Sequence, residues 1–396
     1  MKVLSILDID KNLLKGKRIF LRVDFNVPIE NDIVVDDYRI IKSLATIRYL
    51  LDLGCILILA SHLSRPKGIN LNYSLKPVAK HLSNLLNKEV KFIEIYESNY
   101  IDYLKKVQNE VLKLKSGDVL VLENLRFSEG EEKNDTTLID ELYKLGEIYV
   151  NDAFGTSHRK HASVYGLALK YNIRLAGILM KNEIDYLYKV KENPTKPFYS
   201  IIGGAKVIDK IKVLENLIKV SDKMLIGGAM AYTFLKVKNV PIGNSLVDSE
   251  SFEFAKEFLE KYQNKVILPI DHVVKNSVIK EVENIEENYL GMDIGSRTIE
   301  LFKKELSNAK MIFWNGPLGK FEEKEFSNGT IEIAKYLSKL TKDGTITVIG
   351  GGDTVSAIHM ANLKDEDFSH VSTGGGATLE FISGEEMPGI EVLKNV

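Results

Sequence analysis

STGGGATLE, residues 372–380, follows the apolar Val371 and precedes Phe381. Its three consecutive glycines leave the backbone without side chains, and Ala377, Leu379 and Phe381 have the spacing of a helix start. Free N–H groups at the start of a helix form an anion site that suits a phosphate. A flexible hinge or a tight turn is the alternative, and the stretch alone does not separate these two interpretations.

Apolar runs that end in glycine recur through the second half of the chain. They are SIIGG (200–204), MLIGG (224–228), TVIGGG (347–352) and VSTGGG (371–376), and a fifth run, MIFW (311–314), ends in NGPLG (315–319). Helix-period segments lie between most of them, over 209–219, 249–262, 328–340 and 354–360. Buried strands that alternate with helices predict a doubly wound α/β domain. Its bare strand ends would let a phosphate-bearing ligand approach the backbone.

The apolar runs of the first half end in polar residues instead. RIFLRVDFNVP (18–28), CILILASHLSRP (55–66), DVLVLENLRF (118–127) and IYVNDAFGTSHRKH (148–161) alternate with helix-period segments over 37–53, 75–86, 98–114 and 137–145. This pattern predicts a second parallel sheet, with ligands beyond the carboxyl ends of its strands. The polar side chains at those ends are Asp24, Asn26, His62, Arg65, Arg126 and Arg159. A small, strongly anionic ligand fits them.

Arginine and glycine are distributed unevenly between the two halves. Eight of the nine arginines fall in the first 174 residues, whereas 20 of the 28 glycines come after residue 174. A chain of 396 residues exceeds the usual size of one hydrophobic core, so we predict two domains. The segment 174–191 is compatible with a helix, and NPTKP (193–197) marks a boundary after it.

Composition excludes several classes of protein. The formal net charge of −2 argues against nucleic acid or an anionic membrane as the main partner. The single cysteine, Cys55, lies in an apolar run, which excludes an intrachain disulfide framework and indicates a buried structural role. We expect no signal peptide and no membrane span, and therefore a cytoplasmic location. The P-loop, dinucleotide-binding, protein-kinase and α/β-hydrolase signatures are all missing.

Several residues have a structural interpretation beside the functional one. Arg22, in the middle of a strand, reads as a structural ion-pair partner, whereas Arg39 opens a helix, where a cation is unfavourable unless an anion is near. His158 and His161 could be zinc ligands, but no third ligand has a suitable spacing, so a place beside an anion site or a structural role remains.

The polar residues near the glycines are Lys206, Lys210 and Asp353. Lys206 is interpreted as a phosphate ligand and Asp353 as a ligand of a phosphate-bound magnesium. For Lys210, phosphate binding and a solvated helix position stay open.

Taken together, these segments resemble the phosphoglycerate kinase family. The matching motifs are RVDFNVP (22–28), SHLSRPKG (61–68), LENLRF (122–127), VNDAFGTSHR (150–159), GGAKVIDKI (203–211), WNGPLGKFE (314–322), GGGDT (350–354) and STGGGATLEF (372–381). They span nearly the whole chain in one order. The resemblance implies two doubly wound, Rossmann-like α/β domains that face a cleft and are joined by a helix. It also implies reversible phosphoryl transfer between 1,3-bisphosphoglycerate and ADP, a step of glycolysis that yields 3-phosphoglycerate and ATP.

The resemblance also implies where the domains begin and end and which residues form the site. It implies a 3-phosphoglycerate domain over 1–173 plus 383–396, a connecting helix over 174–191 and a nucleotide domain over 192–382, with domain closure during turnover. The implied substrate ligands are Asp24, Asn26, Arg39, His62, Arg65, Arg126 and Arg159. The implied nucleotide ligands are Gly203, Lys206, Lys210, Gly227, Gly228, Gly291, Asn315, Glu322, Gly351, Gly352, Asp353 and Thr354. Asp353 would hold Mg²⁺, Gly374, Gly375 and Gly376 would contact the transferring phosphoryl group, and a monomer is expected.

Two departures from the family pattern lie near the expected adenine edge. Lys320 stands where the family usually has a small apolar residue, and Ser296 stands where proline is common. These two departures put in question the individual contacts with the adenine base, but not the reaction that the resemblance implies.

The expected chemistry needs no general base, because the acceptor carboxylate is already ionised at neutral pH. Catalysis would then consist of positioning and charge stabilisation by Arg39, Lys206 and the N–H groups of Gly374–Gly376. A non-catalytic binding protein for a sugar phosphate is one rival, which would not explain the glycine-tipped strands. An acetate-kinase-like enzyme is another, which shares the chemistry but not the motifs.

Overall fold

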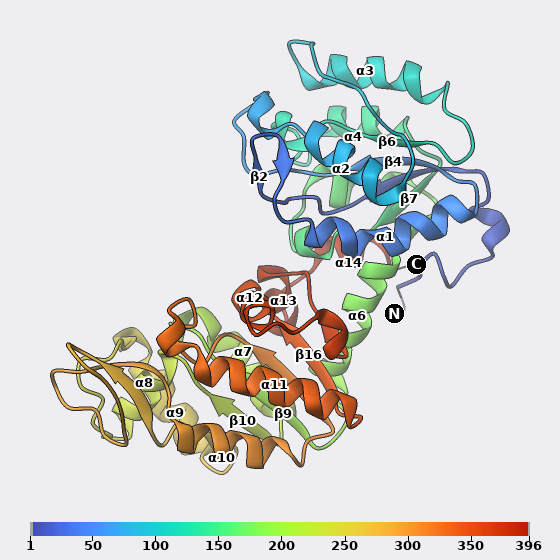
Figure 1. The fold of residues 1–396 in the computed structure, drawn as a ribbon. Helices are drawn as coiled ribbons and strands as arrows, with labels where there is room; N and C mark the ends of the chain where they lie inside the picture. The colour runs from blue at the N-terminus through green and yellow to red at the C-terminus, as the bar shows by residue number, and fades with distance from the viewer. Residues whose placement is uncertain (1–2, 395–396) are drawn as a thin grey trace. The chain divides into compact units, whose positions relative to one another are not determined.

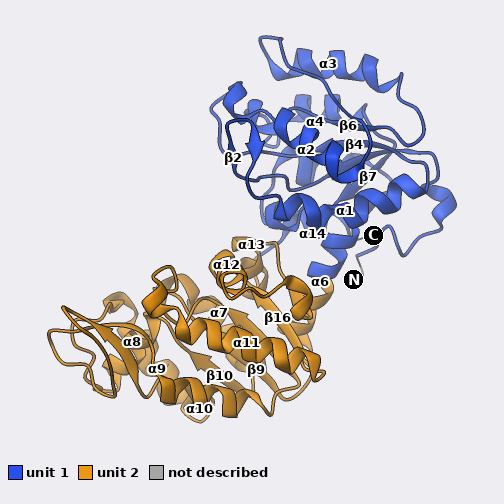
Figure 2. Ribbon diagram, in the orientation of Figure 1, with its two compact units in different colours: residues 1–184, 386–396 blue, residues 185–385 orange. Residues whose placement is uncertain are grey.

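The structure is a computed structural model that describes residues 3–394, and it divides into two compact units. Unit 1 comprises residues 1–184 and 386–396, and unit 2 comprises residues 185–385 (Figure 2). Each unit contains a six-stranded parallel sheet with helices packed against it (Figure 1). The predicted fold class, two doubly wound α/β domains, is therefore confirmed.

The sheet of unit 1 has the strand order β5-β6-β4-β1-β7-β8. Its strands are β1 (Arg18–Arg22), β4 (Ile56–Ala60), β5 (Val90–Phe92), β6 (Val119–Val121), β7 (Ile148–Asn151) and β8 (Arg174–Ala176), and every neighbouring pair is parallel. The helices are α1 (Tyr38–Asp52), α2 (Lys76–Leu86), α3 (Tyr100–Val111), α4 (Thr136–Tyr143) and α5 (Leu167–Lys170). A short hairpin, β2 (Ile29–Glu30) and β3 (Ile33–Val34), follows β1. Alternate residues of the central strands, such as Ile19 and Leu21, form one hydrophobic core with α1 and α2.

The sheet of unit 2 has the strand order β11-β10-β9-β15-β16-β17 and is also parallel throughout. Its strands are β9 (Phe198–Ile202), β10 (Lys223–Ile226), β11 (Val266–Ile267), β15 (Met311–Asn315), β16 (Ile346–Gly350) and β17 (His370–Val371). The helices are α7 (Ile211–Val220), α8 (Met230–Val237), α9 (Phe252–Tyr262), α10 (Ser296–Leu306), α11 (Asn328–Lys342), α12 (Gly352–Met360) and α13 (Gly376–Ile382). The core around Trp314 and Ile349 is closed by α10 and α11.

An antiparallel sheet in unit 2 was not predicted. It consists of β12 (His272–Lys275), β13 (Ile279–Val282) and β14 (Leu290–Ile294), in the order β13-β12-β14. These strands are short, and β13 is exposed along much of its length, so the sequence has no continuous apolar run there.

The segment expected to form a helix over 174–191 begins as a strand. Arg174–Ala176 is β8, which pairs with β7 and buries Leu175 and Ala176, and the helix α6 runs over Ile178–Glu192. The expectation was wrong for these first residues because a three-residue strand cannot be told from a helix turn by periodicity.

The end of the described chain belongs to unit 1. Its helix α14 (Pro388–Glu391) lies against the strand-end loop of β7, where the Gly389 N–H donates to the Ser157 carbonyl oxygen at 2.8 Å. Asn151 Nδ2 donates in turn to the Gly389 carbonyl oxygen at 3.3 Å.

Candidate active site

The first group of site residues lies beyond the carboxyl ends of β1 and β4 in unit 1. Asp24 is buried, and its Oδ2 accepts a 2.6 Å hydrogen bond from Nη1 of Arg39, the second residue of α1. Its Oδ1 accepts from the Asn26 N–H at 3.2 Å and lies 3.9 Å from Nδ1 of His62. The carboxylate of Asp24 therefore explains why a cation is tolerated at the start of α1.

His62 is a neutral hydrogen-bond donor. Burial lowers its pKa well below the ordinary value, and the positive charges of neighbouring arginines, Arg22 first, lower the pKa further. Arg22 Nη2 lies 3.4 Å from His62 Nδ1, and a guanidinium can only donate. The imidazole therefore carries its proton on Nε2, which is the tautomer that can donate to an anion.

Behind His62 lies a buried network that the sequence did not reveal. Arg22 Nε donates to Ser163 Oγ at 2.8 Å, and this hydroxyl donates to Glu131 Oε1 at 2.5 Å. The Ser163 N–H also donates to Glu131 Oε2 at 3.0 Å, and all three side chains are fully buried. Arg22 has the structural role expected of it. The sequence did not identify Glu131 as the acidic residue of this network, because Glu131 belongs to a run of charged residues of the kind that usually faces solvent.

Arg126 and Arg159 extend the positive cluster. Arg126 is buried, and its Nη1 donates to the Ser64 carbonyl oxygen at 2.6 Å, while Arg159 Nε donates to His158 Nε2 at 2.9 Å. Burial, reinforced by Arg126 and other neighbouring cations, lowers the pKa of His161 to about 3, so this histidine is neutral. Among residues 3–394 no cluster of three metal-ligating side chains occurs, which removes the zinc interpretation of His158 and His161.

Arg65 lies apart from these contacts. It is exposed and follows Ser64, which has a positive φ of 55° and whose N–H donates to Asn26 Oδ1 at 2.8 Å. The loop that carries Arg65 is thus tied to Asn26, while the guanidinium itself reaches solvent.

In unit 2 the glycines of the predicted site fall into two groups. In the first group a Cβ would clash with protein atoms. At Gly203 it would lie 2.1 Å from the Pro317 carbonyl oxygen, and at Gly228 it would lie 2.6 Å from the Gly204 nitrogen. At Gly291 it would lie 2.1 Å from the Tyr232 hydroxyl. A Cβ at Gly227 would likewise contact the side chain of Leu318. These four positions are glycine because other parts of the protein pack against them.

The second group faces open space. A Cβ at Gly352, Gly375 or Gly376 would meet nothing within 4 Å, and Gly375, which precedes α13, has a φ of 54°. Gly351, directly before α12, also has a positive φ, of 92°, but a Cβ there would lie 2.5 Å from Asn315 Nδ2. Close approach by a ligand is available at the glycines that open α12 and α13.

Lys210 and Asn315 connect the strand ends. Lys210 Nζ donates to the Gly203 carbonyl oxygen at 2.6 Å and to Asn315 Oδ1 at 2.7 Å, while Asn315 Nδ2 donates to the Gly350 carbonyl oxygen at 2.8 Å. Burial lowers the pKa of Lys210 to about 8, against the opposing effect of Asp353. A solvated helix position for Lys210 is therefore excluded.

Thr354 is buried, and its hydroxyl group forms a hydrogen bond with a neighbouring loop. Its Oγ1 accepts from the Gly316 N–H at 2.7 Å, so its hydroxyl holds the loop after β15 against α12.

Two adjoining cavities lie over these loops. One, of about 460 Å³, has a largely apolar lining that includes Ala229, Leu246, Leu290, Met292 and Pro317. The other, of about 350 Å³, is lined by lysines and glycine backbone, including Lys206, Lys210, Gly352 and Gly376. Both cavities include Gly204, Ala205, Pro317 and Asp353 in their linings. An apolar recess that opens into a recess of cations and bare N–H groups suits a nucleoside joined to phosphates.

The exposed residues of the predicted nucleotide site line these cavities. Lys206 lines the polar cavity and Glu322 the apolar one, and Asp353 lines both. A magnesium ion in a nucleotide site needs only one or two carboxylates besides the phosphates, so a lone Asp353 fits an ion that arrives with the nucleotide.

The two departures from the family pattern differ in position. Lys320 lines the apolar cavity, and its amine lies 2.5 Å from Glu323 Oε1. Ser296 is the first residue of α10 and donates through Oγ to Glu281 Oε1 at 2.5 Å, outside the residues that line either cavity. Lys320 therefore lies at one of the two cavities, and Ser296 lines neither of them.

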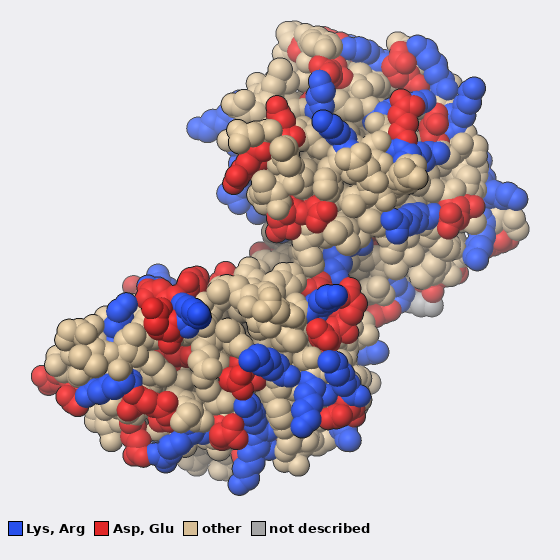
Figure 3. Space-filling model, viewed as in Figure 1, with Lys and Arg blue, Asp and Glu red and all other residues tan. Residues whose placement is uncertain are grey.

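The buried position predicted for Cys55 is confirmed. Cys55 is buried, and burial raises the pKa of its thiol to about 11, as a structural role requires. Within residues 3–394 no helix is long and apolar enough to span a membrane. Acidic and basic side chains are interspersed over the face seen in Figure 3.

The chain was compared with known families, curated proteins and solved structures. The family profile described as phosphoglycerate kinase matches residues 8–385. The phosphoglycerate kinase of Thermosipho africanus is 48% identical, with 100% of this chain and 98% of that protein covered. That of Fervidobacterium nodosum is 47% identical, with 98% of each covered.

Two solved structures give the same result. Phosphoglycerate kinase from Coxiella burnetii matches with a TM-score of 0.87 at 36% identity, over 99% of both chains. The enzyme from Pyrococcus horikoshii matches with a TM-score of 0.82 at 31% identity, over 99% of this chain and 98% of that one. This chain therefore belongs to the phosphoglycerate kinase family, transferases whose known activity is the phosphoryl transfer of glycolysis between ATP and 3-phosphoglycerate.

Proposed function

We propose that each unit holds one substrate of the family reaction: unit 1 binds 3-phosphoglycerate or 1,3-bisphosphoglycerate, and unit 2 binds ADP or ATP with Mg²⁺. The observation that carries this assignment is the pair of adjoining cavities in unit 2, one apolar and one lined by cations and open glycines. A nucleotide needs both environments next to each other, whereas a phosphorylated three-carbon acid needs only the cationic one.

The substrate site of unit 1 is built to compensate negative charge. Arg39, Arg126 and Arg159 supply positive charge, and neutral His62 supplies an N–H group. Arg65 and Asn26 complete the proposed set, and Asp24 orients Arg39. Arg22 fixes the tautomer of His62, and its buried neighbours Ser163 and Glu131 would hold Arg22 in place.

The nucleotide site assigns separate tasks to its residues. The apolar cavity would receive the base, with Gly291 and Glu322 at its wall. Lys206, Lys210 and the N–H groups after Gly351 and Gly375 would bind phosphates, and Asp353 would hold the magnesium that neutralises phosphate charge. Gly203, Gly227 and Gly228 would act by letting the loops pack. Asn315 and Thr354 would fix Lys210 and the neighbouring loop.

Transfer would be direct and in line. The acceptor carboxylate is ionised at neutral pH, so the site needs positive charge and alignment rather than a base, and neutral His62 and His161 agree with that. Since the substrates belong to different units, the units must close on each other to align the reacting oxygens and to exclude water. Small-angle scattering should show a smaller radius of gyration with both substrates bound, and an unchanged radius would contradict closure.

A coupled assay tests the function itself. The purified protein should produce ADP from Mg-ATP only when 3-phosphoglycerate is present. ADP formation with acetate in its place would favour an acetate-kinase-like enzyme, and binding of 3-phosphoglycerate without turnover would favour a binding protein. We also propose that the enzyme is a cytoplasmic monomer. Sedimentation of the purified protein checks the monomer.

A further inference from the structure

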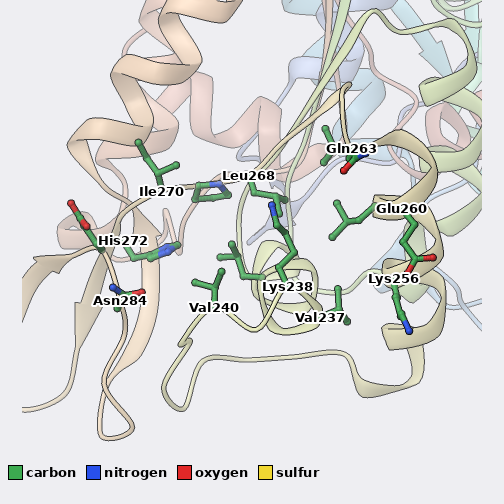
Figure 4. Close-up of a pocket in the computed structure, with 15 residues that line it drawn as sticks. Val237, Lys238, Val240, Lys256, Glu260, Gln263, Leu268, Ile270, His272 and Asn284 are labelled. Atoms are coloured by element: carbon green, nitrogen blue, oxygen red, sulfur yellow. The ribbon is translucent and has the colours of Figure 1, made fainter.

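Unit 2 contains another cavity, of about 540 Å³, which the proposed reaction does not use (Figure 4). It lies where the end of α8, helix α9, and the segment from β11 to β12 meet, and it shares no lining residue with the two nucleotide cavities. Its volume falls within the roughly 300–1,000 Å³ typical of small-molecule sites.

One side of this cavity is apolar, and the rest of its lining is polar or charged. Leu235 and Val240 come from the end of α8 and the turn after it, Leu259 from α9, and Leu268 and Pro269 from the segment after β11. Leu235, Val240 and Leu268 belong to one hydrophobic cluster, so the wall is the outer surface of packed core rather than a set of mobile side chains. Such a surface favours a ligand with an apolar body.

A buried polar group stands in the same wall. His272, the first residue of β12, is only 1% exposed, and its Nδ1 has no hydrogen-bond partner among the described residues. Burial lowers its pKa to about 4, so the ring is neutral. Figure 4 shows the ring directed from its strand toward the interior of the cavity, on the side of Val240. A buried polar atom left without a partner costs free energy that a ligand can recover.

The cavity is lined by two cations, Lys238 and Lys256, and two carboxylates, Glu260 and Glu283. Figure 4 shows the side chain of Lys238 directed inward toward Leu268, while Lys256 and Glu260 lie at the edge. Within the described chain Lys238 has no ion pair, whereas Glu283, another lining residue, is paired with Arg297. A lysine that is directed inward beside apolar side chains complements a carboxylate attached to an apolar group.

We propose that this cavity is a second ligand site, which binds a small amphipathic monocarboxylate. The carboxylate accepts from the amine of Lys238, the apolar body lies on Leu235, Val240 and Leu268, and the ring of His272 supplies the second polar contact. A solvated lysine above an empty surface depression is the alternative that the experiment must distinguish.

The test uses full-length protein saturated with Mg-ADP, so that the nucleotide cavities are filled. 3-Phenylpropionate is the probe, and its uncharged isostere 3-phenylpropanamide is the control. Binding is followed by the methyl resonances of leucine and valine in ¹H–¹³C spectra. We expect saturable shifts at Leu235, Val240 and Leu268, with the acid bound at least tenfold more tightly than the amide.

Variants make the result specific. Lys238→Met should remove the preference for the acid and keep amide binding, whereas Lys256→Met, at the edge, should behave as wild type. Leu268→Trp should fill the cavity and abolish binding of both probes, with ADP binding as the check that unit 2 is folded. Equal binding of acid and amide, no shift at these methyls, or an undiminished acid preference in Lys238→Met would each overturn the proposal.

Discussion

Lys210 and Asn315 are joined by a 2.7 Å hydrogen bond from Nζ to Oδ1, between a helix start and the end of a central strand. The same amine donates to the Gly203 carbonyl oxygen at 2.6 Å, so it is held at a fixed point in the wall of the polar cavity. Its burial lowers its pKa to about 8, which is close to neutral pH.

We expect ADP affinity to fall as the pH rises through about 8. The free amine loses its proton in that range, while a bound phosphate favours the charged amine, so binding must take up a proton above the pKa of Lys210. The dissociation constant of Mg-ADP, measured by titration calorimetry, should be flat below pH 7.5 and rise up to about tenfold per pH unit above 8. Lys210→Met should bind more weakly with a flat profile.

Lys212→Met is the matched control, because Lys212 lies two residues beyond Lys210 in the chain, on α7, and pairs with Glu385 at the surface. It should keep the wild-type profile. A wild-type dissociation constant that does not change between pH 7 and 9.5 would contradict the role of Lys210.

The two groups of glycines should respond differently to alanine. Gly376→Ala places a methyl group in open space at the start of α13, so the melting temperature should stay within a few degrees of wild type. Gly203→Ala places a methyl 2.1 Å from a backbone oxygen and should destabilise the protein by about 1–3 kcal/mol or prevent folding. The phosphoryl group is expected over Gly376, so kcat should fall in Gly376→Ala although the fold is intact. A folded Gly376→Ala variant with wild-type kcat would show that no reacting group approaches there.

Arg39 should act mainly on the transition state. Arg39→Ala should lower kcat by roughly 10²–10³-fold and raise KM much less, since a guanidinium beside the transferring group stabilises charge that develops during transfer. Lys206→Ala should behave in the same way. Arg48→Ala, an exposed position on the same helix, should leave both constants near wild type. Steady-state kinetics in both directions measures this, and a rise in KM without loss of kcat would assign Arg39 to ground-state binding.

Asp152 should make the stability of unit 1 depend on pH in an unusual direction. Burial raises the pKa of this carboxyl to about 6 in the fold, where its Oδ1 accepts from the Met180 N–H at 3.1 Å. Between the unfolded pKa near 4 and about 6, the folded state binds the extra proton. Stability is therefore lost as the pH rises through this window and stays low above it.

Asp152→Asn should remove that dependence. At pH 7.5 the variant should be more stable than wild type by up to about 3 kcal/mol, and the difference should shrink toward pH 4. Calorimetric melting temperatures from pH 4 to 8 test this. Asp140→Asn, which breaks the surface pair with Lys170, is the control and should change stability little at any pH. A constant difference between Asp152→Asn and wild type across this range would contradict the raised pKa.

Most of the candidate site residues of unit 1 could be predicted from the sequence by one rule about parallel sheets. The polar residues after β1 and β4 lie at neighbouring strand ends, because parallel strands place their carboxyl ends on one edge. Asp24, Asn26 and His62 were therefore named together before their contacts were known, whereas Arg39 was singled out as a cation at a helix start. Glu131 and Ser163 were not, because a residue in a surface-like charged run gives no sign that the fold buries it beside Arg22.

The roles of the glycines show the same limit in unit 2. Sequence alone makes Gly203 and Gly376 equivalent, each at the end of an apolar run or the start of a helix. Their difference depends on what lies opposite: the backbone of the loop after β15 for Gly203, and open space for Gly376. The cavity at His272 was likewise missed, since its wall comes from three segments that no periodic pattern connects.

The sequence by itself determined the fold class, the order of the strand-end motifs and the phosphate chemistry, because these depend on local periodicity and on residue types at strand ends. The tertiary structure alone decided which charges are buried, which histidines are neutral, that Lys210 titrates near pH 8 and which glycines a ligand can reach. These properties come from burial and from contacts between segments far apart in the chain, and desolvation depends on what surrounds a side chain in space rather than on its neighbours in sequence.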